Sequence, residues 1–396
     1  MRLKKSLLRK KRKNESIFKY IMSVSHLWLG LLSSVVVFVV CMSGATYSFK
    51  TQIQELLNYD VVFSRDSKGD DFVSINVLQN QFESEGLLIT SITIPETTSR
   101  NILVTYKDQT DEEGHFYVHP ENGKIIGTSS SSAGDFFNLM KQIHKELLLG
   151  KVGKQIVGAS ILIFVVLLLS GLVVWFPKKT TQLKKGLTIK WSAKLPRVIY
   201  DLHNTLGFYT FILLLFISVT GLYVSYSWVK SGIIVSLGGV AVLSENSSEA
   251  AKAEMSNVFA SFLDDVIDSQ SDKQKELKEI SLDSLLSDVN LKLPYKAITI
   301  LDFPTEEEAY YHITKINQEN LLKAILPDEI EYTKEGEFKS LQKFTDQPLH
   351  KQFTAISLPL HTGEIMGLPG IILYFIATLI AASMPVTGIL IWVRKL

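Results

Sequence analysis

The sequence predicts an integral membrane protein that joins a four-helix transmembrane bundle to two extracytoplasmic α+β domains. Three observations lead to this fold class. Four charge-free apolar runs each have at least 23 residues, long polar segments follow the first and third runs, and the spacing of His, Gly and Trp repeats between the two halves. A helix needs about 20 apolar residues to span the hydrocarbon core.

The charge-free runs cover residues 27–49, 155–177, 202–229 and 365–393. Only helices and closed barrels satisfy their backbone polar groups in lipid, and these runs are too long and continuous for barrel strands. We therefore expect transmembrane helices over 21–49, 154–177, 202–229 and 365–393. The first is longer than the apolar region of a signal peptide, and no small-residue cleavage site ends it before Lys50, so we expect a retained anchor.

The distribution of charge predicts the orientation. Residues 1–20 hold nine Lys/Arg and one acid, Glu15, and residues 178–200 hold seven Lys/Arg and no acid. Basic short loops stay in the cytoplasm. We expect a bacterial-type multi-pass membrane protein with 1–20, 178–201 and 394–396 in the cytoplasm, and with 50–153 and 230–364 as the extracytoplasmic domains.

Both polar segments show an α+β pattern. In the first we expect a helix over 72–83, strands over 87–94 and 102–106, and a hairpin of 115–119 with 124–127. In the second we expect a helix over 282–289, strands over 297–301 and 309–314, and surface helix and loop over 244–274. The one cysteine, Cys41, lies in the first span, which excludes an intramolecular disulfide and thiolate zinc or iron–sulfur sites.

The chain reads as two copies of one plan of span, domain and span. The first and third spans share the spacing of a histidine and two glycines, four and 18 residues later: His26, Gly30 and Gly44 against His203, Gly207 and Gly221. In the second and fourth, glycines follow a histidine by six and nine residues, and a Ser/Thr-Gly pair precedes a tryptophan: His144, Gly150, Gly153, Gly171 and Trp175 against His361, Gly367, Gly370, Gly388 and Trp392. These matches indicate internal duplication, and parallel repeats often place shared sites between the copies.

Four of the eight histidines lie at the mouths of the spans. The topology places His26 and His203 near the cytoplasmic face, and His144 and His361 near the outer face. Two imidazoles on facing helices suit the axial positions of a haem iron. We therefore expect two haem groups, one near each membrane face, with these four histidines as cofactor-binding residues and iron ligands.

Two other interpretations of these histidines remain open. A histidine at a helix end can simply lie at the interface or neutralise the helix dipole. Zinc or copper would need further ligands, for which Asp201, Glu146 and Glu364 are the carboxylates near the spans.

The remaining histidines carry weaker signals. We expect His115, His119 and His312 to be ordinary strand positions, and His350 is a candidate substrate-side or alternate ligand. No P-loop, dinucleotide-binding, HExxH or GxSxG motif is present, so flavin or NAD(P)H oxidation would belong to another protein. The topology explains the basic runs, and nothing indicates nucleic-acid binding.

Several motifs resemble the PepSY-associated transmembrane family, also called PiuB-like or iron-regulated membrane proteins. They are His26-x-Trp-Leu-Gly30, Arg197-x-x-x-Asp-Leu-His203-x-x-Leu-Gly207, Leu360-His361-Thr-Gly363 and the closing 386–394 segment. The 118–127 turn resembles the terminal hairpin of a PepSY domain, whereas 331–338 departs from that hairpin pattern. The resemblance covers about residues 16–396.

The resemblance implies an inner-membrane protein of a kind often encoded with siderophore uptake. Some members resemble di-haem ferric-siderophore reductases, which implies His26, His144, His203 and His361 as ligands of haem b. Our hypothesis is haem-dependent electron transfer from a quinol or cytoplasmic donor to ferric iron, held by a siderophore, in a cleft of the outer domains at the periplasmic face. The alternative is a non-enzymatic PepSY-domain membrane protein that binds or inhibits a peptidase or other partner. A permease component for iron or copper complexes is a third possibility.

Overall fold

The computed structural model describes residues 10–13, 15–129, 131–177, 180–240, 281–305, 310–318 and 324–394. The segment 244–274, expected as surface helix and loop, lies outside these residues. The chain divides into two compact units. We call them the helical unit, Met1–Ile53, Ser132–Val229 and Ser357–Leu396, and the sheet unit, Gln54–Ser131 and Lys230–Ile356.

Four long apolar helices dominate the helical unit: α2 (Ile17–Tyr47), α7 (Gly150–Trp175), α9 (Leu195–Ser225) and α14 (Gly367–Val393). Each is long and apolar enough to cross a membrane, which confirms the predicted transmembrane bundle. At about 1.5 Å per residue they are roughly 39–46 Å long, more than the hydrocarbon core requires. Helix α9 begins well before its charge-free run. Pro196 lies in its first turn, where proline is tolerated.

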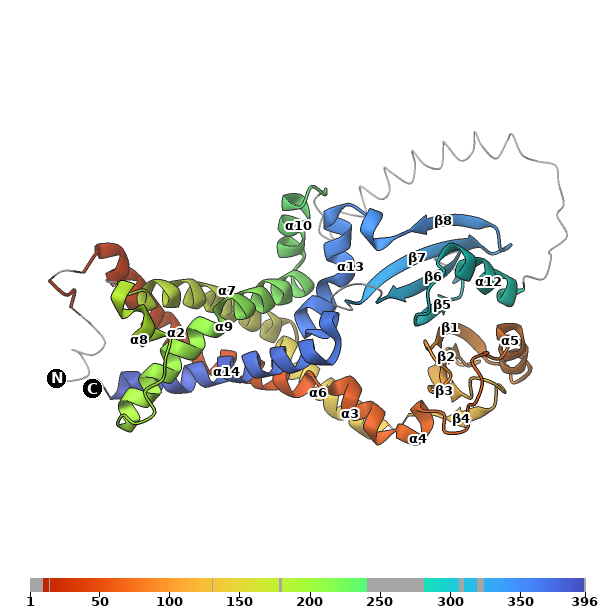
Figure 1. The fold of residues 1–396 in the computed structure, drawn as a ribbon, viewed down its shortest axis with the longest axis horizontal. Helices are drawn as coiled ribbons and strands as arrows, with labels where there is room; N and C mark the ends of the chain where they lie inside the picture. The colour runs from red at the N-terminus through yellow and green to blue at the C-terminus, as the bar shows by residue number, and fades with distance from the viewer. Residues whose placement is uncertain are drawn as a thin grey trace. The chain divides into compact units, whose positions relative to one another are not determined.

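The four helices form a ring in which α2 and α9 each pack against both α7 and α14 (Figure 1). Every helix contributes to a buried apolar cluster in the interior: Val37, Phe164, Leu214, Ala377 and Ala381. Large apolar side chains such as Leu32 and Ile212 are exposed on the outside, as lipid-facing residues are. The bundle interior is therefore closed by side-chain packing at this level.

Two shorter helices, α6 (Ser131–Glu146) and α13 (Leu349–Thr362), lead into α7 and α14. The chain turns between α6 and α7 and again between α13 and α14. The glycines six and nine residues after His144 and after His361 make these two turns possible. Gly150 and Gly367 have φ of 56° and 59°, which favours glycine. A Cβ on Gly153 or Gly370 would overlap a carbonyl oxygen, that of Glu146 or of Gly363.

The sheet unit contains one antiparallel sheet of eight strands, in the order β4-β3-β2-β1-β5-β6-β7-β8. The first four strands come from the first polar segment and the last four from the second: β1 (Leu88–Ile94), β2 (Ile102–Lys107), β3 (Glu113–Val118), β4 (Ile125–Gly127), β5 (Thr299–Asp302), β6 (Tyr310–Asn317), β7 (Leu326–Thr333) and β8 (Phe338–Gln342). Strand β1 pairs with β5 from Ser91↔Asp302 to Ile94↔Thr299. The two expected α+β regions thus share a single sheet.

Helices α5 (Ile75–Ser84) and α12 (Leu282–Lys292) pack their apolar residues onto one face of this sheet. Leu78 and Phe82 of α5 are buried there with Ile92 of β1 and Leu301 of β5, so one core serves both halves. Burial of such side chains stabilises the fold by about 1.5–3 kcal/mol each.

The N-termini of α5 and α12 cap each other. Asp283 of α12 accepts from the Ile75 amide of α5 at 2.7 Å, and Asn76 of α5 accepts from the Leu282 amide of α12 at 2.9 Å. The first amides of a helix have no partner within the helix, so each of these bonds satisfies a group that would otherwise need water. The exchange holds the two halves of the sheet unit together.

The expectation that 331–338 lacks a hairpin is wrong. Strands β7 and β8 pair in an antiparallel hairpin, and Gly336, with φ of 76°, makes the turn. Among the short helices, α3 (Lys50–Leu57) follows α2 directly, α4 (Tyr59–Val62) precedes the sheet, α8 (Leu183–Gly186) lies between α7 and α9, and α10 (Ser227–Ser236) follows α9.

Candidate functional site

The four histidines at the span mouths lie on four different helices. His26 is in the first third of α2 and His203 in the first third of α9, whereas His144 and His361 are in the last turns of α6 and α13. All four side chains are half-buried. Each imidazole therefore belongs to the helical unit, at a position where its helix enters the bundle.

These histidines meet in two pairs. The ring centroids of His26 and His203 are 6.5 Å apart, with ring planes at 89°. Those of His144 and His361 are 6.2 Å apart, with planes at 52°. Each pair takes one ring from before the basic link 178–200 and one from after it, so the structure brings together the residues that the repeat spacing pairs.

The separation within each pair suits two axial ligands of one metal ion. An imidazole nitrogen binds a metal at about 2.0–2.1 Å, which puts two axial ring centroids roughly 6.3 Å apart. The observed centroid distances of 6.5 and 6.2 Å lie on either side of that value. An imidazole pair without further donors is the usual ligand set of a six-coordinate haem iron.

Backbone carbonyls fix the tautomer of the second pair. His144 Nδ1 is 2.8 Å from the carbonyl oxygen of Val40, and His361 Nδ1 is 3.0 Å from that of Ile217. A carbonyl oxygen only accepts, so both Nδ1 atoms carry a proton and donate. In a neutral imidazole the lone pair then lies on Nε2, which is the nitrogen that can ligate a metal.

Hydroxyl groups do the same for the first pair. His26 Nδ1 is 3.0 Å from Ser170 Oγ, and His203 Nδ1 is 2.8 Å from Thr387 Oγ1. Both hydroxyls already donate to carbonyl oxygens of their own helices, Ser170 to Leu167 and Thr387 to Ser383. They therefore accept from the imidazoles, and these rings too present Nε2 as the ligand nitrogen.

A glycine of a neighbouring span faces each ring. A Cβ built on these glycines would meet the imidazole Cε1 at 2.7 to 3.5 Å: Gly221 with His361 at 2.7 Å, Gly44 with His144 at 2.8 Å, Gly171 with His26 at 3.1 Å and Gly388 with His203 at 3.5 Å. All four glycines follow a Ser or Thr. The small-residue pairs are thus notches that receive the imidazoles. The notches of α2 and α9 receive the rings of α6 and α13, and those of α7 and α14 receive the rings of α2 and α9.

The two pairs are near opposite ends of the bundle. On α2, His26 and the notch for His144 at Gly44 are 18 residues apart, and on α9 His203 and Gly221 have the same spacing. Eighteen residues of helix extend about 27 Å. That length approaches the thickness of a hydrocarbon core, about 30 Å.

The other expected positions are not part of these pairs. His115 lies in β3 and bonds to Ser129 Oγ at 2.7 Å, and His119 lies just beyond β3 and bonds to Ser64 Oγ at 3.2 Å. His312 lies in β6, 3.9 Å from a Glu331 oxygen. His350, on the sheet-unit part of α13, has a buried Nδ1 without a hydrogen-bond partner among the described residues.

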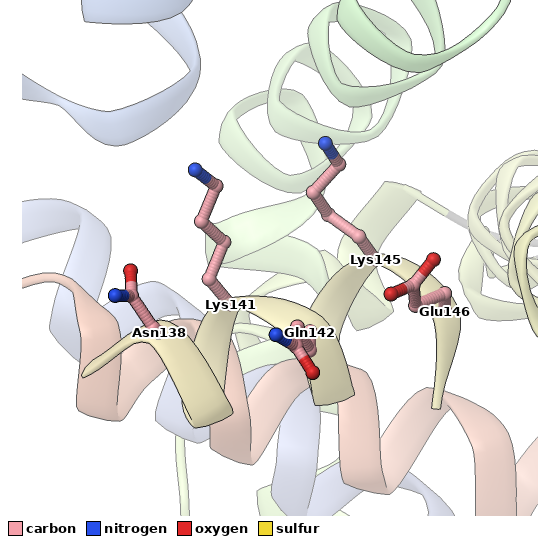
Figure 2. A pocket seen from close by; sticks show the side chains of 5 residues that line it. All are labelled: Asn138, Lys141, Gln142, Lys145 and Glu146. Carbon is pink, nitrogen blue, oxygen red and sulfur yellow. The ribbon is translucent and has the colours of Figure 1, made fainter. Parts of the chain in front are cut away.

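The carboxylates considered for zinc or copper do not complete a metal site in the described part of the chain. Asp201 is buried and bound by Arg197 Nε at 2.9 Å and by the Lys190 amide at 3.3 Å. Across the described ranges no group of three or more His, Cys, Asp or Glu residues is arranged to hold a metal ion. Glu146 instead lines a hollow over α6, together with Asn138, Lys141, Gln142 and Lys145 (Figure 2).

Sequence reasoning found the histidines but missed the residues that orient them. The acceptors Ser170, Thr387, Val40 and Ile217 belong to the helices that the imidazoles pack against. A usable signal was present, because each Ser/Thr-Gly pair stands at a fixed spacing from a histidine or a tryptophan. Small residues in membrane helices mark close approach, but not which side chain approaches.

Comparison with known proteins agrees with this architecture. The family described as PepSY-associated TM region matches residues 24–395, a range that includes α7, α9, α14, all but the first turns of α2, the whole sheet and all four histidines. No curated protein sequence matches the chain. Since the family match covers nearly the whole sequence, the chain belongs to the PepSY-associated transmembrane family.

Proposed function

We propose that this membrane protein transfers electrons through two haem b groups and reduces ferric iron, presented as a siderophore complex, at the periplasmic face during iron uptake. The observation that carries the proposal is that the four imidazoles form two pairs. The ring centroids are 6.5 Å apart in one pair and 6.2 Å apart in the other. In all four rings Nδ1 bonds to a neighbouring helix. Ring orientation and tautomer are thereby prepared for ligation through Nε2.

In this proposal His26 and His203 hold one haem, and His144 and His361 hold the other. A bound haem supplies an iron that accepts and releases one electron at a time. The acceptors on the neighbouring helices hold the imidazoles in one orientation and make Nε2 more basic. The apolar spans exclude water from the ligands, and the opposite positions of the pairs fit a role in moving electrons across the membrane.

The basic segments support the orientation that we propose. Residues 10–13 and the 180–197 link carry Lys and Arg near the ends of α2 and α9, which supports a cytoplasmic-side position for His26 and His203 in this proposal. A quinol or a cytoplasmic reductant would donate electrons at that side. The sheet unit would then lie in the periplasm and bind the ferric complex, and the reduced iron would be released because hard oxygen ligands hold it less strongly.

We also propose that the chain arose by internal duplication. The strand order is symmetric about the contact of β1 with β5, and the caps of α5 and α12 are exchanged at equivalent positions. The four imidazole notches follow the same symmetry. In such a protein each haem would lie between the copies.

The test is to purify the full chain after expression with adequate haem and to count haems by absorption spectroscopy. We expect a Soret band and two haems per chain. His26→Ala or His203→Ala should lose one haem, and His144→Ala or His361→Ala the other, because each removes one axial ligand. The matched control is His115→Ala, which changes a strand histidine of the sheet unit and should retain both haems.

A purified chain without a Soret band would refute the haem proposal. That result would favour the alternative, a non-enzymatic membrane protein whose PepSY-like sheet domain binds or inhibits a peptidase or another partner. If the chain binds two haems, a dithionite-reduced sample should be reoxidised by a ferric siderophore complex with formation of ferrous iron. No reoxidation would separate haem binding, which would stand, from ferric-iron reduction, which would not.

A further inference from the structure

The indole N–H of Trp392 is a buried donor close to the first histidine pair. Its Nε1 has no hydrogen-bond partner among the described residues. Trp392 lies in the last turn of α14, four residues after Gly388, which is the glycine that faces His203. Residues four apart lie one above the other on a helix face, so the donor is about 6 Å further along α14 than that notch.

The equivalent tryptophan of the first half shows how such a donor is satisfied. Trp175 lies four residues after Gly171, the glycine that faces His26. Its Nε1 donates to the carbonyl oxygen of Gly186 at 3.2 Å, and its ring stacks on Phe208 with centroids 3.9 Å apart. The two tryptophans thus occupy matching positions, but only Trp175 has an acceptor among the described residues.

The chemistry of indole restricts the missing partner. A donor that leaves water without a new partner loses its hydration in full, so buried donors in folded proteins are nearly always bonded. Indole Nε1 donates and never accepts, so the partner must offer an acceptor oxygen. A charged acceptor forms a bond about twice as strong as a neutral one.

We propose that Trp392 donates this hydrogen bond to a carboxylate of the macrocycle that His26 and His203 hold, and so positions that macrocycle in the bundle. The inference rests on the proposed function. Haem carries two propionate groups on one edge, and the last turn of α14 is where such an edge would reach the water boundary while its rings stay among the apolar spans. A quinone oxygen is the other source of the same acceptor chemistry.

The test compares haem with its dimethyl ester, which lacks the carboxylate charge, on wild-type protein and on Trp392→Phe. Apo-protein in detergent is titrated with each ligand and followed in the Soret region. We expect Trp392→Phe to weaken haem binding about tenfold to hundredfold at one site and to leave the other unchanged. The ester offers only neutral oxygens, which accept about half as strongly as a carboxylate, so Trp392→Phe should weaken its binding clearly less than that of haem.

Trp175→Phe is the matched control, and it should keep the wild-type preference for haem over the ester because its N–H already bonds to Gly186. The wild-type chain supplies a second test without substitution, since the ester should bind more weakly than haem at one site only. Equal haem affinity for wild type and Trp392→Phe would overturn the proposal. An equal loss for haem and ester would also overturn it, because the carboxylate charge would then play no part, whereas no loss for either ligand would assign the N–H to another oxygen, such as that of a quinone. Failure of the proposed function would look different, because wild type would then bind neither ligand.

Discussion

Replacing Gly221 with alanine tests whether the notch in α9 sets the position of His361. The new Cβ would stand 2.7 Å from the imidazole Cε1, about 0.7 Å inside the 3.4 Å at which ordinary contact begins. The ring cannot turn away freely, because Nδ1 donates to the Ile217 carbonyl of the same helix. Metal–ligand distances tolerate only about 0.2 Å, so a shift of this size should remove the ligand from its site.

The expected result is a chain that folds normally and binds one haem instead of two. Alanine is favoured over glycine by about 0.8–1.0 kcal/mol inside a helix, which offsets part of the cost of displacing the imidazole, so the apo-protein should lose little thermal stability. Haem per chain is measured by the pyridine haemochrome assay and stability by thermal unfolding of the apo-protein.

The matched control for this variant is Gly388→Ala. Its Cβ would meet His203 Cε1 at 3.5 Å, an ordinary van der Waals contact, so both haems should be retained. Two haems bound by Gly221→Ala with wild-type affinity would refute the argument that close packing positions the imidazole. Loss of haem from both variants alike would show that the difference between 2.7 and 3.5 Å has no consequence.

Three further substitutions test other contacts. Thr387→Val removes the hydroxyl that accepts a hydrogen bond from His203. Haem affinity at the site of His26 and His203 should therefore fall roughly 10–100-fold in a haem titration, and unchanged affinity would exclude this orienting role. Asp283→Ala removes the acceptor of the Ile75 amide at the start of α5, so this amide should lose about 1–2 kcal/mol of hydrogen-exchange protection, and wild-type protection would contradict the exchange of bonds between the two helix starts. Hydrogen bonds, first that from Lys292, lower the pKa of Asp288 below its ordinary 3.8. A carboxyl group whose pKa is lower in the folded state stabilises the fold at pH values above its pKa in the unfolded state. That stability is lost as the pH falls through the folded-state pKa. Asp288→Asn should therefore be less stable than wild type at about pH 6 but should lose less stability on acidification below about pH 4 in urea unfolding, and an identical pH dependence would count against it.

The bundle and its histidine pairs could be predicted because the signals are local or periodic. Charge-free runs identify the spans without knowledge of their neighbours. The spacing from His26 to Gly44 recurs from His203 to Gly221, and equal spacing along two helices places equivalent residues at equivalent depths. Gly150 and Gly367 share their spacing from a histidine in the sequence, and only the structure shows that both adopt a positive φ.

The single sheet and the orientation of the imidazoles could not be predicted in the same way. Strand β1 pairs with β5 across more than 200 residues of sequence, and an alternating apolar pattern specifies the face of a strand but not its partner. The hairpin of β7 and β8 was missed because its turn has one glycine, Gly336, and few other turn residues. The acceptor for each imidazole depends on which helix it packs against, and that is a property of the assembled bundle.

The contact of β1 with β5 bears on what half of this molecule could do alone. A fragment that stops after α7 would expose β1 as an unprotected edge, and unprotected edges recruit other strands. Such a fragment would also contain only one histidine of each pair, His26 at one end of the bundle and His144 at the other. Such a fragment could form a homodimer by pairing its β1 edge with that of a second copy. The twofold axis of this dimer would restore both the continuous sheet and the facing imidazole rings.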